Sequence, residues 1–300
     1  MDKTTKNIFF LGKGGVGKST SSALTALHLA EKGKKVQLVS LDPAHNQSDI
    51  FEKKFSEKAT RINSNLTVKE VEINLWVKKY LKDIQFQVKR SYSYLTAFNL
   101  ENYLDIIKYS PGIEEYALLM AYKDIRKKAK NTDYIIFDMP PTALTLKFLT
   151  LPHLSLLWLD NLLALRSKII EKREIITRVR LGKKEIETDK IRNKLNQQIK
   201  EYREIKTVFE DPEKTSLNLV LNTDKLSFSE SELIVANLSR FNMTIQNLFL
   251  NKYHDGFDKT ALEEKYKNCR IQVLKNSDQA LIGIPVLLDY LHRLPAFIEM

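Results

Sequence analysis

A glycine-rich segment near the N-terminus constrains the fold of this 300-residue chain more than any other feature. It has the spacing G-x-x-x-x-G-K-S and comprises Gly12, Lys13, Gly14, Gly15, Val16, Gly17, Lys18 and Ser19, followed by Thr20. The apolar run 7–11 before it predicts a buried strand, and the apolar spacing over 19–32 predicts a helix. Between a strand and a helix, such a segment lets successive backbone N–H groups point at one anion. The sequence therefore predicts a phosphate-binding loop.

The residue types of this loop suit a nucleoside triphosphate bound together with magnesium. Lys18 is placed to reach the β- and γ-phosphates, and the Ser19 hydroxyl is placed to ligate Mg²⁺. We therefore expect residues 12–20 to bind ATP, with Mg²⁺ as the second cofactor. The chain is predicted to be an ATP-hydrolysing enzyme with a P-loop NTPase core.

Strand and helix patterns alternate along most of the chain. Gly33 is suited to end the loop helix as a C-cap, and the stretch 35–41 predicts a second strand. Further strands are predicted at 66–73, 134–138, 217–222, 245–251 and 270–274. Right-handed crossover connections make such strands parallel. The pattern predicts an α/β fold with a doubly wound, mainly parallel sheet flanked by helices.

Two intervals, 74–130 and 154–211, are too long for simple crossovers, and both are predicted to be helical. In the second interval, apolar residues recur every three or four positions over 191–209. Gly182 predicts the turn of a helical hairpin near 181–182. We expect a single ATPase domain over 1–300, with the two inserts forming one helical subdomain.

Two aspartates follow predicted strands. Asp138 ends the strand 134–138 and is expected to lie beside the magnesium ion, as a Walker B acid does. Asp42 follows the strand 35–41, where an acid can orient or deprotonate the attacking water. The alternative role of Asp42 is to cap the next turn. The predicted metal ligands are Ser19 and Asp138, and the predicted catalytic residues include Lys18 and Asp42.

Composition excludes several other classes of protein. Hydrophobic residues make up 43% and charged residues 28%, which is typical of a globular protein. Cys269 is the only cysteine, which excludes an intramolecular disulfide and a zinc site built from several cysteines of one chain. The N-terminal apolar run is too brief for a signal peptide, and polar residues interrupt the most apolar stretch, 149–165. We expect a soluble cytoplasmic protein with no transmembrane segment.

The net charge of +11 is unevenly distributed. The segment 166–208 contains 14 lysines and arginines against 7 acidic residues, a net charge of +7. Such a surface can attract nucleic acid, anionic lipid or an acidic partner. Because opposite charges are interspersed within it, we favour the solvated face of a helical hairpin, and nucleic acid is not the expected partner.

The additional lysine at the start of the loop, Lys13, makes the loop resemble the deviant Walker A loop of the family that includes MinD, ParA, the nitrogenase iron protein and ArsA. In that family the corresponding lysine crosses a dimer interface to the nucleotide of the other subunit. The resemblance therefore implies an ATP-dependent homodimer with Lys13 as a further catalytic residue. Positive charge supplied in trans would stabilise the negative charge that develops during phosphoryl transfer.

Two longer segments resemble the ArsA branch, which includes the arsenical pump-driving ATPases and the tail-anchored-protein targeting ATPases. The run S-L-D-P-A-H-N-Q-S-D-I-F over 40–51 is similar to its switch I motif D-P-A-H-N-x-S-D, in which the first aspartate positions the hydrolytic water. The resemblance assigns that role to Asp42. The run 138–149 resembles switch II, except that Ala143 and Leu144 stand where the family has Gly-His.

Three later segments, 226–232, 248–252 and 284–288, resemble nucleotide-binding parts of the same branch. The resemblance implies that Glu230 contacts the nucleotide, that Asn251 reads adenine, and that Pro285 and Val286 form a loop on the adenine side. The paired cysteines that bind zinc in the targeting ATPases and the spaced cysteines that bind metalloid in the arsenical ATPases are missing. Activation by arsenite is therefore disfavoured.

The predicted function is that of an ArsA-family ATPase in which a nucleotide-driven dimer switch couples hydrolysis to the handling of a client. The client would be a hydrophobic segment of a tail-anchored membrane protein, or an anion or metalloid pump partner. Apolar residues after switch II are candidates for a client groove, with plain helical core as the alternative: Leu154, Leu156, Leu157, Trp158, Leu159, Leu162 and Leu163. The alternative function is a positioning ATPase like ParA or MinD, acting on DNA or a membrane surface through 166–208.

Overall fold

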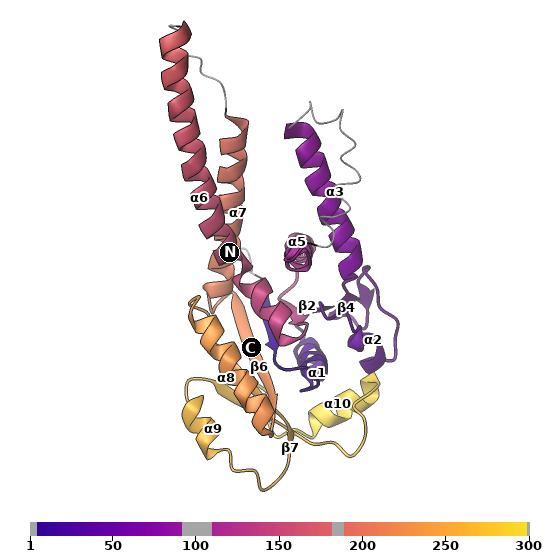
Figure 1. The fold of residues 1–300 in the computed structure, drawn as a ribbon. Coiled ribbons are helices and arrows are strands. Elements are labelled where there is room, and N and C mark those ends of the chain that lie inside the picture. The colour runs from indigo at the N-terminus through magenta and orange to yellow at the C-terminus, as the bar shows by residue number, and fades with distance from the viewer. Residues whose placement is uncertain (1–4, 92–109, 182–188, 299–300) are drawn as a thin grey trace.

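The computed structural model describes residues 5–91, 110–181 and 189–298, which form an α/β fold with helical arms on one side of its sheet (Figure 1). The strands are β1 (Lys6–Leu11), β2 (Val36–Ser40), β3 (Thr60–Arg61), β4 (Leu66–Glu70), β5 (Tyr134–Asp138), β6 (Thr215–Asn222), β7 (Asn247–Tyr253) and β8 (Arg270–Lys275). The helices described are α1 (Lys18–Glu31), α2 (Asn46–Ile50), α3 (Ile73–Ser91), α5 (Ile113–Lys128), α6 (Thr142–Leu181), α7 (Lys190–Glu210), α8 (Lys225–Ser239), α9 (Thr260–Lys265) and α10 (Ile284–His292).

The described strands form one eight-stranded sheet in the order β3-β4-β2-β5-β1-β6-β7-β8. All neighbouring pairs are parallel except β3 and β4, which are antiparallel. This confirms the predicted doubly wound, mainly parallel sheet. The two-residue strand β3 lies at the sheet edge and was not predicted, since two residues carry no periodicity that the sequence could reveal.

Strand β1 is central, with β5 on one side and β6 on the other. The chain adds strands first on the β5 side and then on the β6 side, so the carboxyl end of β1 lies where the connections change direction. In open parallel sheets, ligands bind in the crevice at this point. The glycine-rich loop is therefore at the topological switch point of the sheet.

Alternate residues of β1 are buried in two different cores. Phe9 and Leu11 belong to the core beneath α5, α6, α7 and α8, while Ile8 and Phe10 belong to the core beneath α1 and α10. Because side chains of a strand alternate between the two faces of a sheet, an unbroken apolar run is needed where both faces are covered. Burial on both faces holds the loop rigidly at its start.

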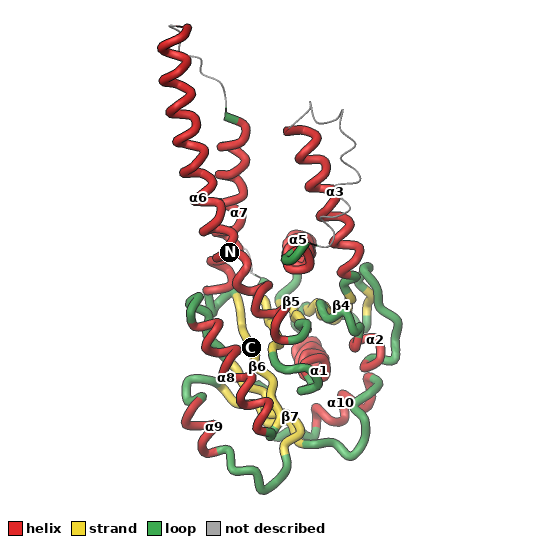
Figure 2. The backbone as a smooth tube through the Cα atoms, viewed as in Figure 1, coloured by secondary structure: helices red, strands yellow, loops and turns green. Residues whose placement is uncertain are grey.

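Helices occupy both long intervals of the chain, and they form the arms seen in Figure 2. Helices α6 and α7 pack against each other through a cluster built on Leu156, Leu159 and Ile199. Asp189 caps the start of α7 by accepting hydrogen bonds from two backbone N–H groups, and its carboxylate also pairs with Arg166 of α6, at 3.1 Å. Helix α6 ends at Leu181, and the predicted turn residue Gly182 lies outside the described residues.

Helix α6 begins earlier than the predicted insert and continues through Pro152, which lies buried within it. By length and composition alone, its segment Thr142–Lys172 would suffice to cross a membrane, with a mean hydropathy of 1.4 in the most apolar window. The polar interruptions therefore do not exclude a span on their own, contrary to our expectation. Only 33% of that window is buried in the structure, and one such helix is weak evidence for a span.

Candidate functional site

The loop between β1 and α1 has a packed base and an open tip. A Cβ atom on Gly12 would lie 2.3 Å from the backbone oxygen of Val220, and one on Gly17 would lie 2.1 Å from Nδ2 of Asn251. Both glycines have positive φ, 145° and 96°. By contrast, a Cβ on Gly14 or Gly15 would meet nothing within 4 Å. The loop is thus packed against neighbouring atoms at Gly12 and Gly17 and open at Gly14 and Gly15, which leaves room for a phosphate group at its tip.

Lys18 begins α1 and is buried. Its Nζ donates a hydrogen bond to the backbone oxygen of Lys13, at 3.0 Å, so the side chain curls back over the loop. Burial lowers the pKa of Lys18, while the negative charges of Asp138, Asp42 and Glu230 oppose that shift. A buried cation among acids at the loop is suited to neutralise phosphate charge.

Asp138 and Asp42 lie close together because their strands are neighbours. Ser40 of β2 pairs with Asp138 of β5, and the N–H of Leu41 donates to the backbone oxygen of Asp138, at 2.9 Å. Asp138 is fully buried, and burial raises its pKa to about 6, against the lowering effects of hydrogen bonds from Gln47 and Ser19 and of the Lys18 charge. The carboxyl ends of two parallel strands thus bring both predicted acids to the loop.

The site fits a small hard cation such as Mg²⁺. The Oδ1 atom of Asp138 is buried without a hydrogen-bond partner, and the Ser19 hydroxyl lies close enough to bond the same carboxylate. Oxygen donors of this type suit Mg²⁺, which usually takes only one or two protein ligands together with phosphates and water. Among the residues that the structure describes, no group of three or more His, Cys, Asp or Glu side chains could hold a metal. The oxygen atoms of Ser19 and Asp138 are of the type that fits such a cation.

Asp42 has a turn-capping contact of the kind that we considered as its alternative role. Its Oδ1 accepts a hydrogen bond from the N–H of Ala44, at 3.0 Å, and its side chain is nearly buried. This contact occupies one carboxylate oxygen. The capping contact therefore holds the carboxylate in a defined orientation beside Lys18 and is compatible with a role in orienting water.

Two side chains at the site were not identified from the sequence. The amide of Gln47, in α2, donates to Asp138 Oδ2 at 2.9 Å. The carboxylate of Glu70, at the end of β4, accepts from both the N–H and the hydroxyl of Ser48, each at 2.8 Å. Glu70 was missed because the strand was predicted to continue to residue 73, whereas β4 ends at Glu70. Nothing in the local sequence distinguishes Gln47 from a surface amide.

The later predicted residues occupy different parts of the site. Glu230 of α8 accepts a hydrogen bond from the hydroxyl of Thr142, at the start of α6, and is close enough to affect the pKa of Lys18. Asn251 donates its amide to the backbone oxygen of Val16, at 2.8 Å.

Pro285 and Val286 lie at the start of α10, just after Gly283. The N–H of Gly283 donates to the backbone oxygen of Ile50 in α2, at 2.8 Å. Within the described chain, no hydrogen bond connects Pro285 or Val286 with the loop 12–20. The segment just before α10 is thus bonded to α2 through Gly283.

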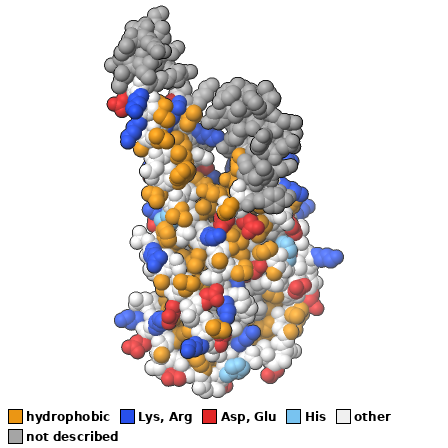
Figure 3. Space-filling model, in the orientation of Figure 1, with side chains coloured by type: hydrophobic (Ala, Val, Ile, Leu, Met, Phe, Trp, Pro, Cys, Tyr) orange, Lys and Arg blue, Asp and Glu red, His pale blue; other side chains and the backbone are white. Residues whose placement is uncertain are grey.

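The exposed face of α6 carries an apolar stripe. At 100° per residue, its exposed apolar members lie within roughly 120° of one another around the helix: Leu154, Leu157, Trp158, Leu165 and Ile169. Figure 3 shows hydrophobic side chains along this arm. The candidate groove residues therefore fall into a buried group and an exposed group. Leu156 and Leu159 are core residues packed on α7, whereas the side chains of Leu157 and Trp158 are 65% and 66% exposed.

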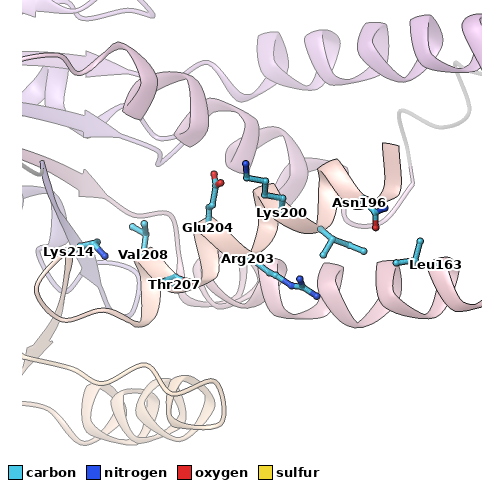
Figure 4. A pocket seen from close by; sticks show the side chains of 9 residues that line it. Leu163, Asn196, Lys200, Arg203, Glu204, Thr207, Val208 and Lys214 are labelled. Atoms are coloured by element: carbon cyan, nitrogen blue, oxygen red, sulfur yellow. The ribbon is translucent and has the colours of Figure 1, made fainter. Parts of the chain in front are cut away.

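A groove of about 710 Å³ lies along α7, lined by residues of α7 together with Leu163 of α6 and Lys214 (Figure 4). Its aliphatic floor includes Ile199, and its cations include Lys200 and Arg203. Within the basic segment 166–208, Arg203 lies 3.7 Å from Asp160 and Lys206 lies 3.8 Å from Glu210. Part of the positive charge of the basic segment is thus paired within the protein.

Comparison with known proteins gives consistent results. A sequence model of the anion-transporting ATPase family matches residues 5–286. The chain is 31% identical over 245 residues to a putative arsenical pump-driving ATPase 2 of Aquifex aeolicus (strain VF5), covering 81% of this chain and 79% of that protein. It is 30% identical over 281 residues to an ATPase ASNA1 homolog of Cryptosporidium parvum (strain Iowa II), covering 93% and 72%. It is 31% identical over 257 residues to the ATPase GET3 of Mycosarcoma maydis, covering 83% and 73%.

Proposed function

Because the chain belongs to the ArsA-type anion-transporting ATPase family and is an ATP hydrolase, we propose that it uses Mg-ATP to control the binding of an apolar helical client. The observation that carries this proposal is the apolar stripe of α6, which is exposed on the same helix that begins at the nucleotide site. We further propose a cytoplasmic homodimer of one domain per chain, in which the inserts 74–130 and 154–211 form one helical subdomain.

The proposed roles follow from the positions of the side chains. The backbone N–H groups of 12–20 bind the phosphates, and Lys18 neutralises their charge from within the loop. Ser19 and Asp138 hold Mg²⁺, which supplies positive charge to the phosphate oxygens when bound. Asp42, held by the N–H of Ala44, orients or deprotonates the attacking water.

The later residues have supporting roles in this proposal. Glu230 and Asn251 position the nucleotide beside the loop, to which both are already close. Pro285 and Val286 contribute the adenine side, joined to switch I through the contact between Gly283 and Ile50. Lys13 acts in trans on the nucleotide of a second copy, as in the family whose loop it resembles.

A continuous helix provides the coupling in this proposal. Helix α6 has 40 residues, and its first residue, Thr142, bonds Glu230 next to the loop. At 1.5 Å per residue, such a helix spans roughly 60 Å. A shift of switch II on nucleotide binding or hydrolysis would therefore move the stripe that begins three turns further along the same helix.

The stripe has the chemistry of a surface that binds an apolar helix. Leu157 and Trp158 are large apolar side chains that are almost two-thirds exposed, and they are adjacent on one face. Contiguous exposed apolar surface in a folded protein marks a binding site for protein or membrane. An apolar helix laid along the stripe would cover its leucines and remove them from water.

The test is nucleotide-dependent capture of a labelled apolar helical peptide by the full-length protein. The double variant Leu157→Gln with Trp158→Gln is expected to weaken capture by at least tenfold while ATP hydrolysis stays within twofold. Leu233→Gln, which changes an exposed leucine of α8, is the matched control and should retain capture. Capture that is unchanged in the double variant would contradict the proposed client surface.

The alternative of a positioning ATPase makes a different prediction in the same experiments. Binding to DNA or to anionic vesicles would then depend on the basic residues of 166–208 and weaken steeply with salt. The ion pairs of Arg203 with Asp160 and of Lys206 with Glu210 reduce the charge available for such contacts. Salt-sensitive binding to DNA or vesicles, without capture of the peptide, would favour the alternative.

A further inference from the structure

Gln47 occupies the position that the switch I motif D-P-A-H-N-x-S-D leaves variable, yet its side chain is completely buried at the nucleotide site. Its Nε2 lies 2.9 Å from Oδ2 of Asp138, 3.0 Å from Oγ of Ser22 and 3.1 Å from the backbone oxygen of Ser19. Switch I and the two proposed metal ligands are thus joined through one amide group.

The orientation of this amide follows from its partners. A carboxylate oxygen and a backbone oxygen can only accept hydrogen bonds, so the NH₂ group must face Asp138 and Ser19. The hydroxyl of Ser22 donates to the backbone oxygen of Ser19, at 2.8 Å, so it too can only accept from Gln47. Three acceptors surround a nitrogen that has two hydrogens. The NH₂ group of Gln47 is therefore fully used on the side of Asp138.

The opposite atom of the same amide has no partner. Oε1 of Gln47 is buried without a hydrogen bond, and so is Oδ1 of Asp138. A buried acceptor without a partner costs roughly 1–3 kcal/mol, and buried exceptions of this kind commonly mark a place for water or an ion. Two such oxygens occur on two side chains that are bonded to each other.

The residue before Gln47 contributes to the same arrangement. Nδ2 of Asn46 lies 3.5 Å from Oγ of Ser19, while Gln47 bonds the backbone oxygen of Ser19. The first turn of α2 therefore contacts both the hydroxyl and the carbonyl of Ser19, and also the carboxylate of Asp138.

We infer that Gln47 is a positioning residue for the magnesium site. Its NH₂ group holds Oδ2 of Asp138, which would leave Oδ1 free to bind the cation. Partners that orient metal ligands in this way commonly contribute 10–100-fold to metal affinity. The inference rests on the Mg²⁺ site of the proposed function, and it assigns Gln47 no contact with ATP.

The experiment measures the equilibrium affinity of the full-length protein for fluorescent ADP, with Mg²⁺ and with EDTA, and takes the ratio of the two affinities. In Gln47→Leu this ratio is expected to fall at least tenfold from that of the unchanged protein, while the affinity in EDTA stays within threefold. Gln47→Asn keeps an amide but is one methylene too short to reach Asp138, so it should show the same loss. A circular dichroism spectrum establishes that each variant is folded.

Gln272→Leu is the matched control, because Gln272 is also a buried amide, bonded to the backbone of Ala296 and Ile298 away from the loop. It is expected to lower stability and to leave the magnesium ratio unchanged. A ratio in Gln47→Asn within twofold of the unchanged protein would overturn the inference and leave the proposed function standing. A ratio of one in the unchanged protein would instead refute the proposed Mg²⁺ site itself.

Discussion

Replacement of Asp42 by asparagine isolates its charge from its structural contact. Oδ1 of Asp42 accepts from the N–H of Ala44 at 3.0 Å, and the amide oxygen of asparagine can accept the same hydrogen bond. The stability change should therefore stay below about 1 kcal/mol, the typical net value of one hydrogen bond. What the substitution removes is a negative charge close to Lys18 and the capacity to take a proton from water.

The expected loss is that of a general base. Proton transfer by a positioned side chain contributes roughly 10²–10⁴-fold to a rate, which corresponds to about 2.7–5.5 kcal/mol of barrier. We expect kcat of Asp42→Asn to fall in this range while nucleotide affinity is retained or slightly increased, because a negative charge near the phosphates has been removed.

The assay combines phosphate release at saturating Mg-ATP with equilibrium binding of fluorescent ATP. Asp255→Asn changes an exposed aspartate far from the loop in sequence, 81% exposed at its side chain, and serves as the matched control. Hydrolysis by Asp42→Asn within twofold of the unchanged protein would remove Asp42 from the mechanism. Joint loss of binding and hydrolysis would show that the turn at Ala44, rather than the charge, is what matters.

Three further predictions concern the site and the arm. Burial raises the pKa of Asp138 to about 6, so the folded protein binds this proton more tightly than the unfolded chain does. Without Mg²⁺, the free energy of unfolding should therefore fall by up to about 3 kcal/mol as pH rises from about 4 to about 6. Urea unfolding of Asp138→Asn across this range should lack that fall. Gly17→Ala should weaken binding of fluorescent ADP at least tenfold, because the added methyl group would collide with Asn251. Asn251→Ala in the same chain should restore only part of the affinity, because residue 17 would still need a positive φ. In thermal and urea unfolding, Leu159→Ala should cost about 2–5 kcal/mol, whereas Leu157→Ala, on the exposed stripe, should change stability by less than about 0.5 kcal/mol.

The agreement between prediction and structure is closest where the local pattern is strong. The strand 134–138 was predicted to the residue, and the strand after the loop helix was predicted to within one residue at each end. Both strands are rich in apolar residues, as strands buried on two faces are. The strand predicted at 66–73 ends instead at Glu70, because the chain passes into α3 at Ile73. Boundaries of this kind depend on packing that the sequence does not display.

Only the structure shows which apolar residues of α6 are buried and which are exposed. Leu156 and Leu157 are neighbours of the same type, yet one packs on α7 and the other faces solvent. Neither composition nor period separates them, because leucines lie on all sides of this part of the helix and the buried face depends on where the partner helix lies. Nothing in the sequence indicated that α6 continues through Pro152, because a proline inside a helical pattern usually ends or kinks the helix.

By itself, the sequence determined that a glycine-rich loop lies between a buried strand and a helix, and that an aspartate stands at the carboxyl end of each of two parallel strands. These features are local, because glycine spacing and apolar runs act through backbone geometry and short-range burial. Only the tertiary structure decided that Gln47 bonds Asp138, 91 positions away, and that Thr142 bonds Glu230, 88 positions away. Hydrogen bonds between distant segments depend on how strands and helices pack, and no pattern within either segment encodes them.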